Sequence, residues 1–112
     1  MPKKPRVPSH LSPATRQWVA GVLREYQLEK HHIHLLILAA EALDRCTQAR
    51  LVIAAEGITT TTADGGVKAH PAVGIERDSR LGFSRLLREL DLDVEPPPAT
   101  RTAPPPLRSN RS

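Results

Sequence analysis

Residues 29–56 read EKHHIHLLILAAEALDRCTQARLVIAAE, and this stretch decides the fold. We predict a single helix here, because Gly57 follows and glycine commonly ends helices. At about 1.5 Å per residue the helix is roughly 40 Å long. Its segment 33–40 is apolar nearly all round, and such a helix must be covered on every side. Two shorter helices of a small chain can hardly cover it, so we predict a homo-oligomer. The residues expected in that contact are Ile33, Leu35, Leu36, Ile37 and Leu38.

A shorter helix is expected before the long one. Ser12 followed by Pro13 suits the cap and the first residue of a helix. Trp18, Val22 and Tyr26 recur at four-residue spacing, which is typical of a buried helical face. We predict that this helix ends near residue 26 or 27.

A small β-hairpin is expected after the long helix. The run Thr59–Thr62 favours a strand, Asp64 with Gly65 is a turn signal, and the second arm is only Val67–Ala69. A hairpin this small is marginal alone in water. It therefore packs on the helices, pairs with a neighbouring subunit or stays mobile.

A third helix is predicted from Pro71 to Leu90, with His70 as its cap. At about 100° per residue, one side is apolar and the opposite side carries arginines. The apolar side holds Ile75, Phe83, Leu86, Leu87 and Leu90, and the arginine side holds Arg77, Arg80, Arg85 and Arg88, with Leu81 among them. Glu76 can pair with Arg80, and Glu89 with Arg85, at four-residue spacing. The fold class is therefore all-α with a small hairpin.

The basic charge lies mainly in the two ends of the chain. The chain has 112 residues and a formal net charge of +4. We expect a basic, proline-rich disordered arm over residues 1–9, a helical core over 10–94 and a disordered Pro/Arg-rich tail over 95–112. Basic arms on a near-neutral body suggest an anionic partner such as nucleic acid, or merely solubilising ends. We expect neither a secretory signal nor a membrane span, and the single cysteine suits a reducing compartment.

The sequence contains no recognisable set of catalytic residues. There is no GxxxxGK[ST] phosphate loop and no cofactor motif. His31, His32 and His34 cluster near the start of the long helix, but a metal site would need further ligands, so we interpret them as polar residues at a helix entrance. We reject a DNA-binding helix-turn-helix, because the helix that would contact the bases, His31–Leu43, is mostly apolar.

Three stretches together resemble the phage terminase small subunit of the P27 family. They are HLSPATRQWVAGVLREYQLE, the run from LLILAAEALDRC to LLRELDL, and the proline-rich basic flanks. The most specific features are E-G-hydrophobic-T, a polar hairpin, H-P-A-V, E-R-D and a helix closing in L-x-R-E-L. The resemblance covers about residues 10–93. It implies a non-enzymatic subunit that assembles into a ring, binds viral double-stranded DNA and hands it to the large terminase subunit, which carries the ATPase and nuclease.

We therefore predict a DNA-packaging protein that acts in the cytoplasm of a bacterial host and needs no cofactor. The expected phosphate contacts are Lys3, Lys4, Arg6, Arg16, Arg24, Arg77 and Arg80. Three alternatives stay open. The first is a dimeric helical transcriptional regulator, the second is an interaction module that binds no DNA, and the third is an accessory of a nucleotide enzyme.

Overall fold

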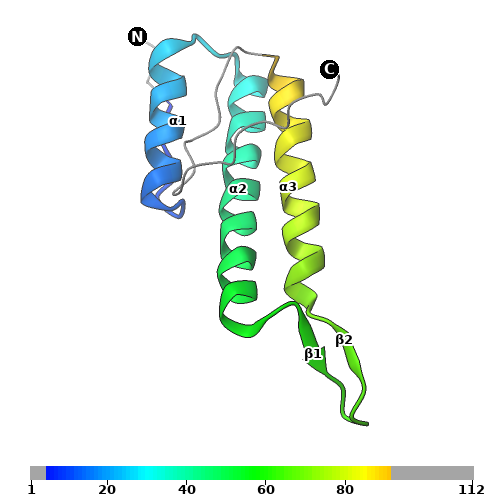
Figure 1. Cartoon of the computed structure of the whole chain (residues 1–112). Coiled ribbons are helices and arrows are strands. Elements are labelled where there is room, and N and C mark those ends of the chain that lie inside the picture. The colour runs from blue at the N-terminus through cyan, green and yellow to red at the C-terminus, as the bar shows by residue number, and fades with distance from the viewer. Residues whose placement is uncertain (1–4, 92–112) are drawn as a thin grey trace, which may run out of the picture.

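The structure is a computed structural model that describes residues 5–91. Within these residues it contains three helices and one two-stranded antiparallel sheet, which confirms the predicted fold class (Figure 1). In chain order the elements are α1 (Pro13–Glu25), α2 (Lys30–Glu56), β1 (Thr59–Thr61), β2 (Val67–Ala69) and α3 (Pro71–Leu90). The arm residues Lys3 and Lys4 and the predicted tail over 95–112 lie outside the described residues.

The helices lie side by side, with α2 in the middle (Figure 1). The helix α3 runs antiparallel to α2 along its length, whereas α1 lies beside only that half of α2 that begins at Lys30. Trp18 of α1 meets Phe83 of α3 edge to face, with ring centroids 5.7 Å apart. The other half of α2 therefore has α3 beside it but no α1.

The core lies where the three helices meet. Its buried members are Leu11, Val19, Val22, Leu36, Ala40 and Leu90. Leu90 was expected in the core, but Ile75, assigned to the same apolar side of α3, is 46% exposed. Ile75 lies in the part of α3 that extends past α1, and the smaller Ala72 takes the buried position there. Helical periodicity therefore predicted which side of α3 is apolar, but not how far along the helix that side is buried.

Specific residues end and begin the elements around the hairpin. Gly57 has φ +86°, a conformation that L side chains rarely adopt, and its N–H donates to the carbonyl of Ile53. The strands pair Thr59 with Ala69 and Thr61 with Val67. The hairpin projects beyond the ends of α2 and α3 (Figure 1), so its side chains are mostly exposed.

His70 caps α3, as predicted. Its Nδ1 accepts a hydrogen bond from the Ala72 N–H at 3.0 Å, and its Nε2 lies 3.0 Å from Glu56 Oε1. One imidazole thus joins the end of α2 to the start of α3. No helix within residues 5–91 is long and apolar enough to cross a membrane.

Candidate nucleic-acid interface

Arg16 and Arg24 lie on the exposed side of α1. The helix begins at Pro13 behind the Ser12 cap and buries Thr15, Val19 and Val22 against the rest of the chain. Arg16 and Arg24 are eight residues apart, which places them about 80° from each other around the helix. Both are exposed, and neither forms an ion pair with any other described residue. Their guanidinium groups are available to an anion from solvent.

A carboxylate of α2 holds the start of α1 in place. Asp44 Oδ2 accepts from the Ser12 N–H at 2.7 Å, and Asp44 Oδ1 accepts from the Thr15 hydroxyl at 2.7 Å and the Ser12 hydroxyl at 2.8 Å. Burial raises the pKa of Asp44, but these hydrogen bonds and the charge of His10 outweigh burial, so the pKa lies below its ordinary value. The sequence interpretation missed this contact because the two segments are about thirty residues apart.

The N-terminal segment adds a further basic side chain. Arg6 is exposed and has no ion-pair partner among residues 5–91. Val7 packs against the core, and His10 Nε2 lies 2.8 Å from Glu41 Oε2 of α2. These contacts hold the segment that carries Arg6 against the helical body.

The arginines of α3 that were expected to bind DNA are partly neutralised. Arg77 Nε lies 3.4 Å from Asp78 Oδ1, and Arg80 Nε lies 3.3 Å from Glu76 Oε2, which confirms the four-residue pair. The same Glu76 oxygen also accepts from Arg50 Nε of α2 at 3.0 Å. In contrast, no ion pair joins Arg85 and Glu89, although both residues are described.

Glu76 is the centre of this polar contact between α2 and α3. It also accepts a long hydrogen bond, 3.5 Å, from the thiol of Cys46. Burial raises the pKa of Glu76, but the hydrogen bonds from Arg50 and Cys46 and the charges of the two arginines outweigh burial, so the pKa is lowered. Burial raises the pKa of the Cys46 thiol, which keeps it protonated. Glu76 therefore stays ionised and attracts Arg50 and Arg80.

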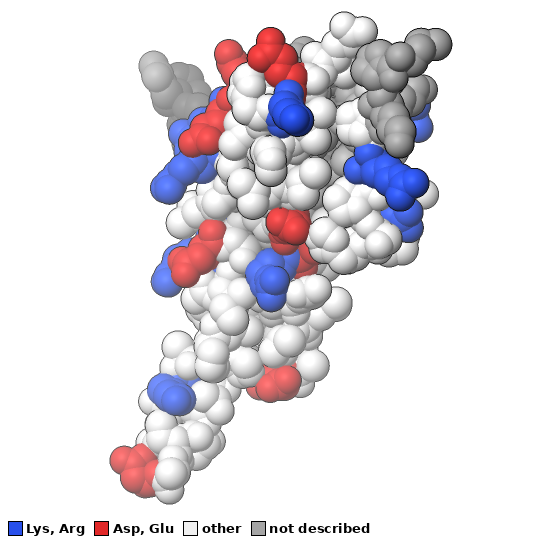
Figure 2. Space-filling view, turned by 180° about the vertical axis from the view of Figure 1, so that it is seen from behind, with Lys and Arg blue, Asp and Glu red and all other residues white. Residues whose placement is uncertain are grey.

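The surface charge agrees with this difference between the helices. Figure 2 shows basic side chains over the α1 side of the molecule without acidic side chains beside them on that face. Over α3, basic and acidic side chains lie next to one another. On that face, a polyanion would meet basic side chains at α1 without neighbouring acidic ones, and a mixture of both signs at α3.

The five residues expected at a subunit contact do not share one environment. Leu36 is fully buried, and Leu38 is 50% exposed. Ile33, Leu35 and Ile37 are half-buried, and Leu35 packs against the core. Leu36 offers no surface to another subunit in this structure, because it packs in the core where the three helices of the same chain meet. Leu38 is the most available of the five for another molecule.

Further apolar surface lies away from segment 33–40. Leu51, Ile58 and Val67 are exposed. Leu51 lies in the half of α2 without α1 beside it, Ile58 lies between α2 and β1, and Val67 lies in β2. A shallow groove of about 270 Å³ lies between α2 and α3. Its lining includes Arg45, Ala49, Val52, Ala72 and Ile75.

A family model described as phage terminase, small subunit, matches residues 11–102 of the chain. The match spans all three helices and the hairpin. Neither a curated protein nor a solved structure matches the chain significantly.

Proposed function

The chain belongs to the family of phage terminase small subunits, and we propose that it binds viral double-stranded DNA as an oligomer and delivers it to the large terminase subunit. Family membership supports a role in phage DNA packaging, and small subunits of this kind are generally non-catalytic. The finer assignment, a P27-type small subunit of a tailed phage or prophage, rests on the sequence features around the hairpin and α3. Its site of action would be the cytoplasm of the bacterial host.

The observation that carries the DNA-binding proposal is the set of basic side chains on and before α1 without acidic partners. Arg6, Arg16 and Arg24 are exposed, and none has an ion-pair partner among the described residues. Lys3 and Lys4 precede them in the sequence and would extend the basic segment. Arginine pairs well with phosphate because its planar fork donates two hydrogen bonds to one group.

Arg77 and Arg80 are weaker candidates for the same role. Each lies beside a carboxylate, so a phosphate would compete with Asp78 or Glu76. Exposed ion pairs contribute less than about 1 kcal/mol, so the competition weakens a contact without forbidding it. We therefore propose α1 and the N-terminal segment as the main contact and the start of α3 as a secondary one.

Self-association would multiply these weak contacts. Leu38 of α2 and the half-buried Ile33, Leu35 and Ile37 are the proposed contacts between subunits. Several copies joined in a closed ring present several α1 faces to one duplex, and the linked contacts bind far more tightly than one. A ring gives a larger mass than a dimer in light scattering coupled to size exclusion, which separates this proposal from a dimeric regulator.

Gel-shift titrations with double-stranded DNA at several salt concentrations test the interface. Each phosphate contact contributes about −0.9 to the slope of log affinity against log salt. The double variant R16Q/R24Q should bind more weakly than wild type and should show a shallower slope. The double variant R77Q/R80Q removes the same charge and should have the smaller effect. A larger loss in R77Q/R80Q would move the interface to α3, and affinity independent of salt would refute phosphate binding.

Delivery to the large subunit needs a separate measurement. The full chain, with DNA bound, should co-purify with the large terminase subunit and alter its ATPase rate. A chain that binds DNA yet neither retains nor affects the large subunit would refute delivery while leaving DNA binding intact.

A further inference from the structure

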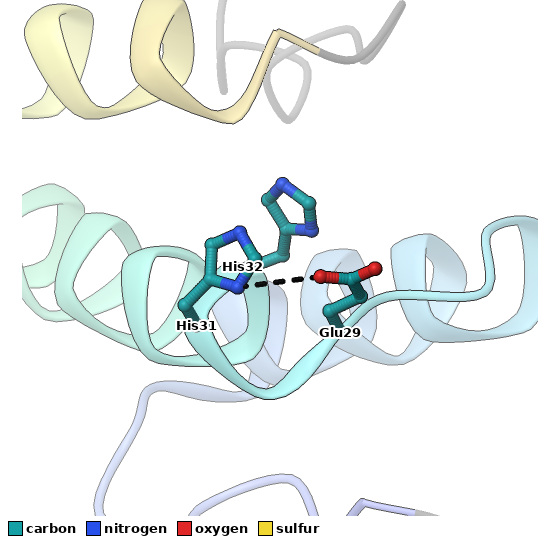
Figure 3. A group of neighbouring side chains, drawn as sticks. All are labelled: Glu29, His31 and His32. Atoms are coloured by element: carbon teal, nitrogen blue, oxygen red, sulfur yellow. Dashed lines mark ion pairs between the residues drawn. The ribbon is translucent and has the colours of Figure 1, made fainter.

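Three potential metal ligands converge where α2 begins. We propose that Glu29, His31 and His32 form a surface site for a divalent transition-metal ion of the zinc class. Their ligand atoms all lie within 4.8 Å of one another. Figure 3 shows the carboxylate of Glu29 turned toward His31, with the ring of His32 close to that of His31. This site is independent of the proposed DNA contacts.

The sequence contained the histidines but did not indicate the third ligand. Glu29 is the residue before the first turn of α2, and its extended backbone, φ −75° and ψ 166°, places it at the cap position. A capping side chain ordinarily accepts a backbone N–H of the first turn, but Glu29 makes no such bond. Its carboxylate is therefore free of helix capping and lies against His31 instead.

The separations suit ligands of one metal ion better than a direct hydrogen bond. His31 Nδ1 lies 3.5 Å from Glu29 Oε2, which is longer than an ordinary N–H···O bond. Two ligands of a tetrahedral zinc ion, each about 2.0–2.1 Å from it, lie about 3.3 Å apart. The imidazole centroids of His31 and His32 are 4.0 Å apart. The three ligand atoms lie within 4.8 Å of one another, so the side chains must turn before all three reach one ion.

The donor set selects the class of ion. Two imidazoles with one carboxylate form the ligand set found in zinc sites that keep a position open for water. Imidazole nitrogen favours zinc, nickel or copper, whereas magnesium and calcium require mainly oxygen ligands. The site should therefore take Zn²⁺ and reject Mg²⁺.

Two features limit the affinity. The start of a helix carries partial positive charge, which repels a cation and lowers its binding affinity by about fivefold at most. The side chains of Glu29 and His31 are also 76% and 65% exposed, so binding must order them. The negative charge of Glu29 offsets the first effect. The site should be saturable but weaker than the closed four-ligand sites that hold structural zinc.

Calorimetric titration of the full chain with zinc chloride tests the site, with magnesium chloride as a second titrant. Wild type should bind one Zn²⁺ per chain and give no saturable heat with Mg²⁺. E29Q should weaken Zn²⁺ binding at least about tenfold, and H31A/H32A should abolish it. H34A is the matched control, because this exposed histidine lies one turn along α2 but outside the cluster. Its affinity should stay within about twofold of wild type.

A second readout separates binding at the site from binding elsewhere. Zn²⁺ should raise the thermal unfolding midpoint of wild type and H34A, since an ion that binds the folded state stabilises it. It should not raise the midpoint of H31A/H32A, whose circular dichroism without metal should match wild type because the histidines are not core residues. Unchanged Zn²⁺ binding in H31A/H32A, an equal loss in H34A, or no saturable binding by wild type would each overturn the proposal.

Discussion

The contact between Asp44 and the start of α1 leads to a quantitative prediction. Replacing Asp44 by alanine removes the acceptor for the Ser12 N–H, the Ser12 hydroxyl and the Thr15 hydroxyl. Thr15 is 3% exposed, so its hydroxyl gains little access to water when the carboxylate is lost. Ser12 is only half-buried, and water can replace part of what it loses.

The structure sets the size of the effect. A hydrogen bond to a charged group contributes about 1.5–3 kcal/mol, which we assign to the buried Thr15 hydroxyl. Loss of support for a helix cap costs about 1 kcal/mol, which we assign to Ser12. We therefore expect D44A to lower the free energy of unfolding by about 2.5–4 kcal/mol. The control E41Q alters an exposed pair with His10 and should cost less than about 0.5 kcal/mol.

The assay is urea unfolding at one protein concentration, monitored both by tryptophan fluorescence and by circular dichroism. Trp18 is the single tryptophan of the chain and contacts Phe83 across α1 and α3, so its fluorescence reports the docking of α1. Far-ultraviolet circular dichroism reports all three helices. In D44A the fluorescence transition should move to lower urea and precede the circular dichroism transition, because α1 loses its anchor first.

The pH dependence gives a second check on the same residue. The pKa of Asp44 in the folded chain lies below its ordinary value of 3.8, so its ionised form is favoured by folding. This stabilisation is complete above the unfolded pKa and is lost as pH falls through the folded pKa. Below about pH 4 wild type should therefore lose stability more steeply than D44A. Equal urea midpoints for D44A and E41Q would refute the reasoning.

Three further predictions concern α2 at Leu36 and Leu38, the end of α2 at Gly57 and the cap of α3 at His70. L36A should lower the free energy of unfolding in urea by about 2–5 kcal/mol, because Leu36 is fully buried. L38A should lower it by less than about 1 kcal/mol, because Leu38 is half exposed, and should instead reduce the oligomer mass measured by light scattering. G57A should destabilise by about 1–3 kcal/mol in the same assay, since φ +86° with ψ 174° is nearly exclusive to glycine; equal stability would exclude that conformation in solution. H70A should lose about 1 kcal/mol through the α3 cap, measured as a lower thermal midpoint, and a replacement by asparagine, which can also cap, should recover part of it.

Local signals in the sequence identified the elements correctly. Ser12 with Pro13 marked the start of α1, Gly57 marked the end of α2, and His70 marked the start of α3. Each of these signals works through the backbone of the residue itself or of its near neighbours, so no distant contact was needed to interpret it. The turn at Gly65, with φ +88°, belongs to the same group.

The candidate sites depended on contacts that no local pattern reports. The contacts of Arg50 and Cys46 with Glu76 and the anchoring of α1 by Asp44 join residues that are far apart in the sequence and arise from how the helices pack. Four-residue spacing predicted acidic partners for Arg80 and Arg85 of α3, and the folded chain forms only the first of these two pairs. Among the described arginines expected to bind DNA, acidic side chains pair with Arg77 and Arg80 of α3 and not with those of α1.

The sequence by itself determined the helices, the hairpin and the apolar side of each helix, since propensity, capping and periodicity act over a few residues. Only the tertiary structure decided which part of each side is covered. The helix α1 has 13 residues and α2 has 27, so α1 shields one half of its neighbour and leaves the other half without it. Burial of Leu36 and exposure of Ile75 follow from that difference in length, because hydrophobic side chains leave water only where another element reaches them.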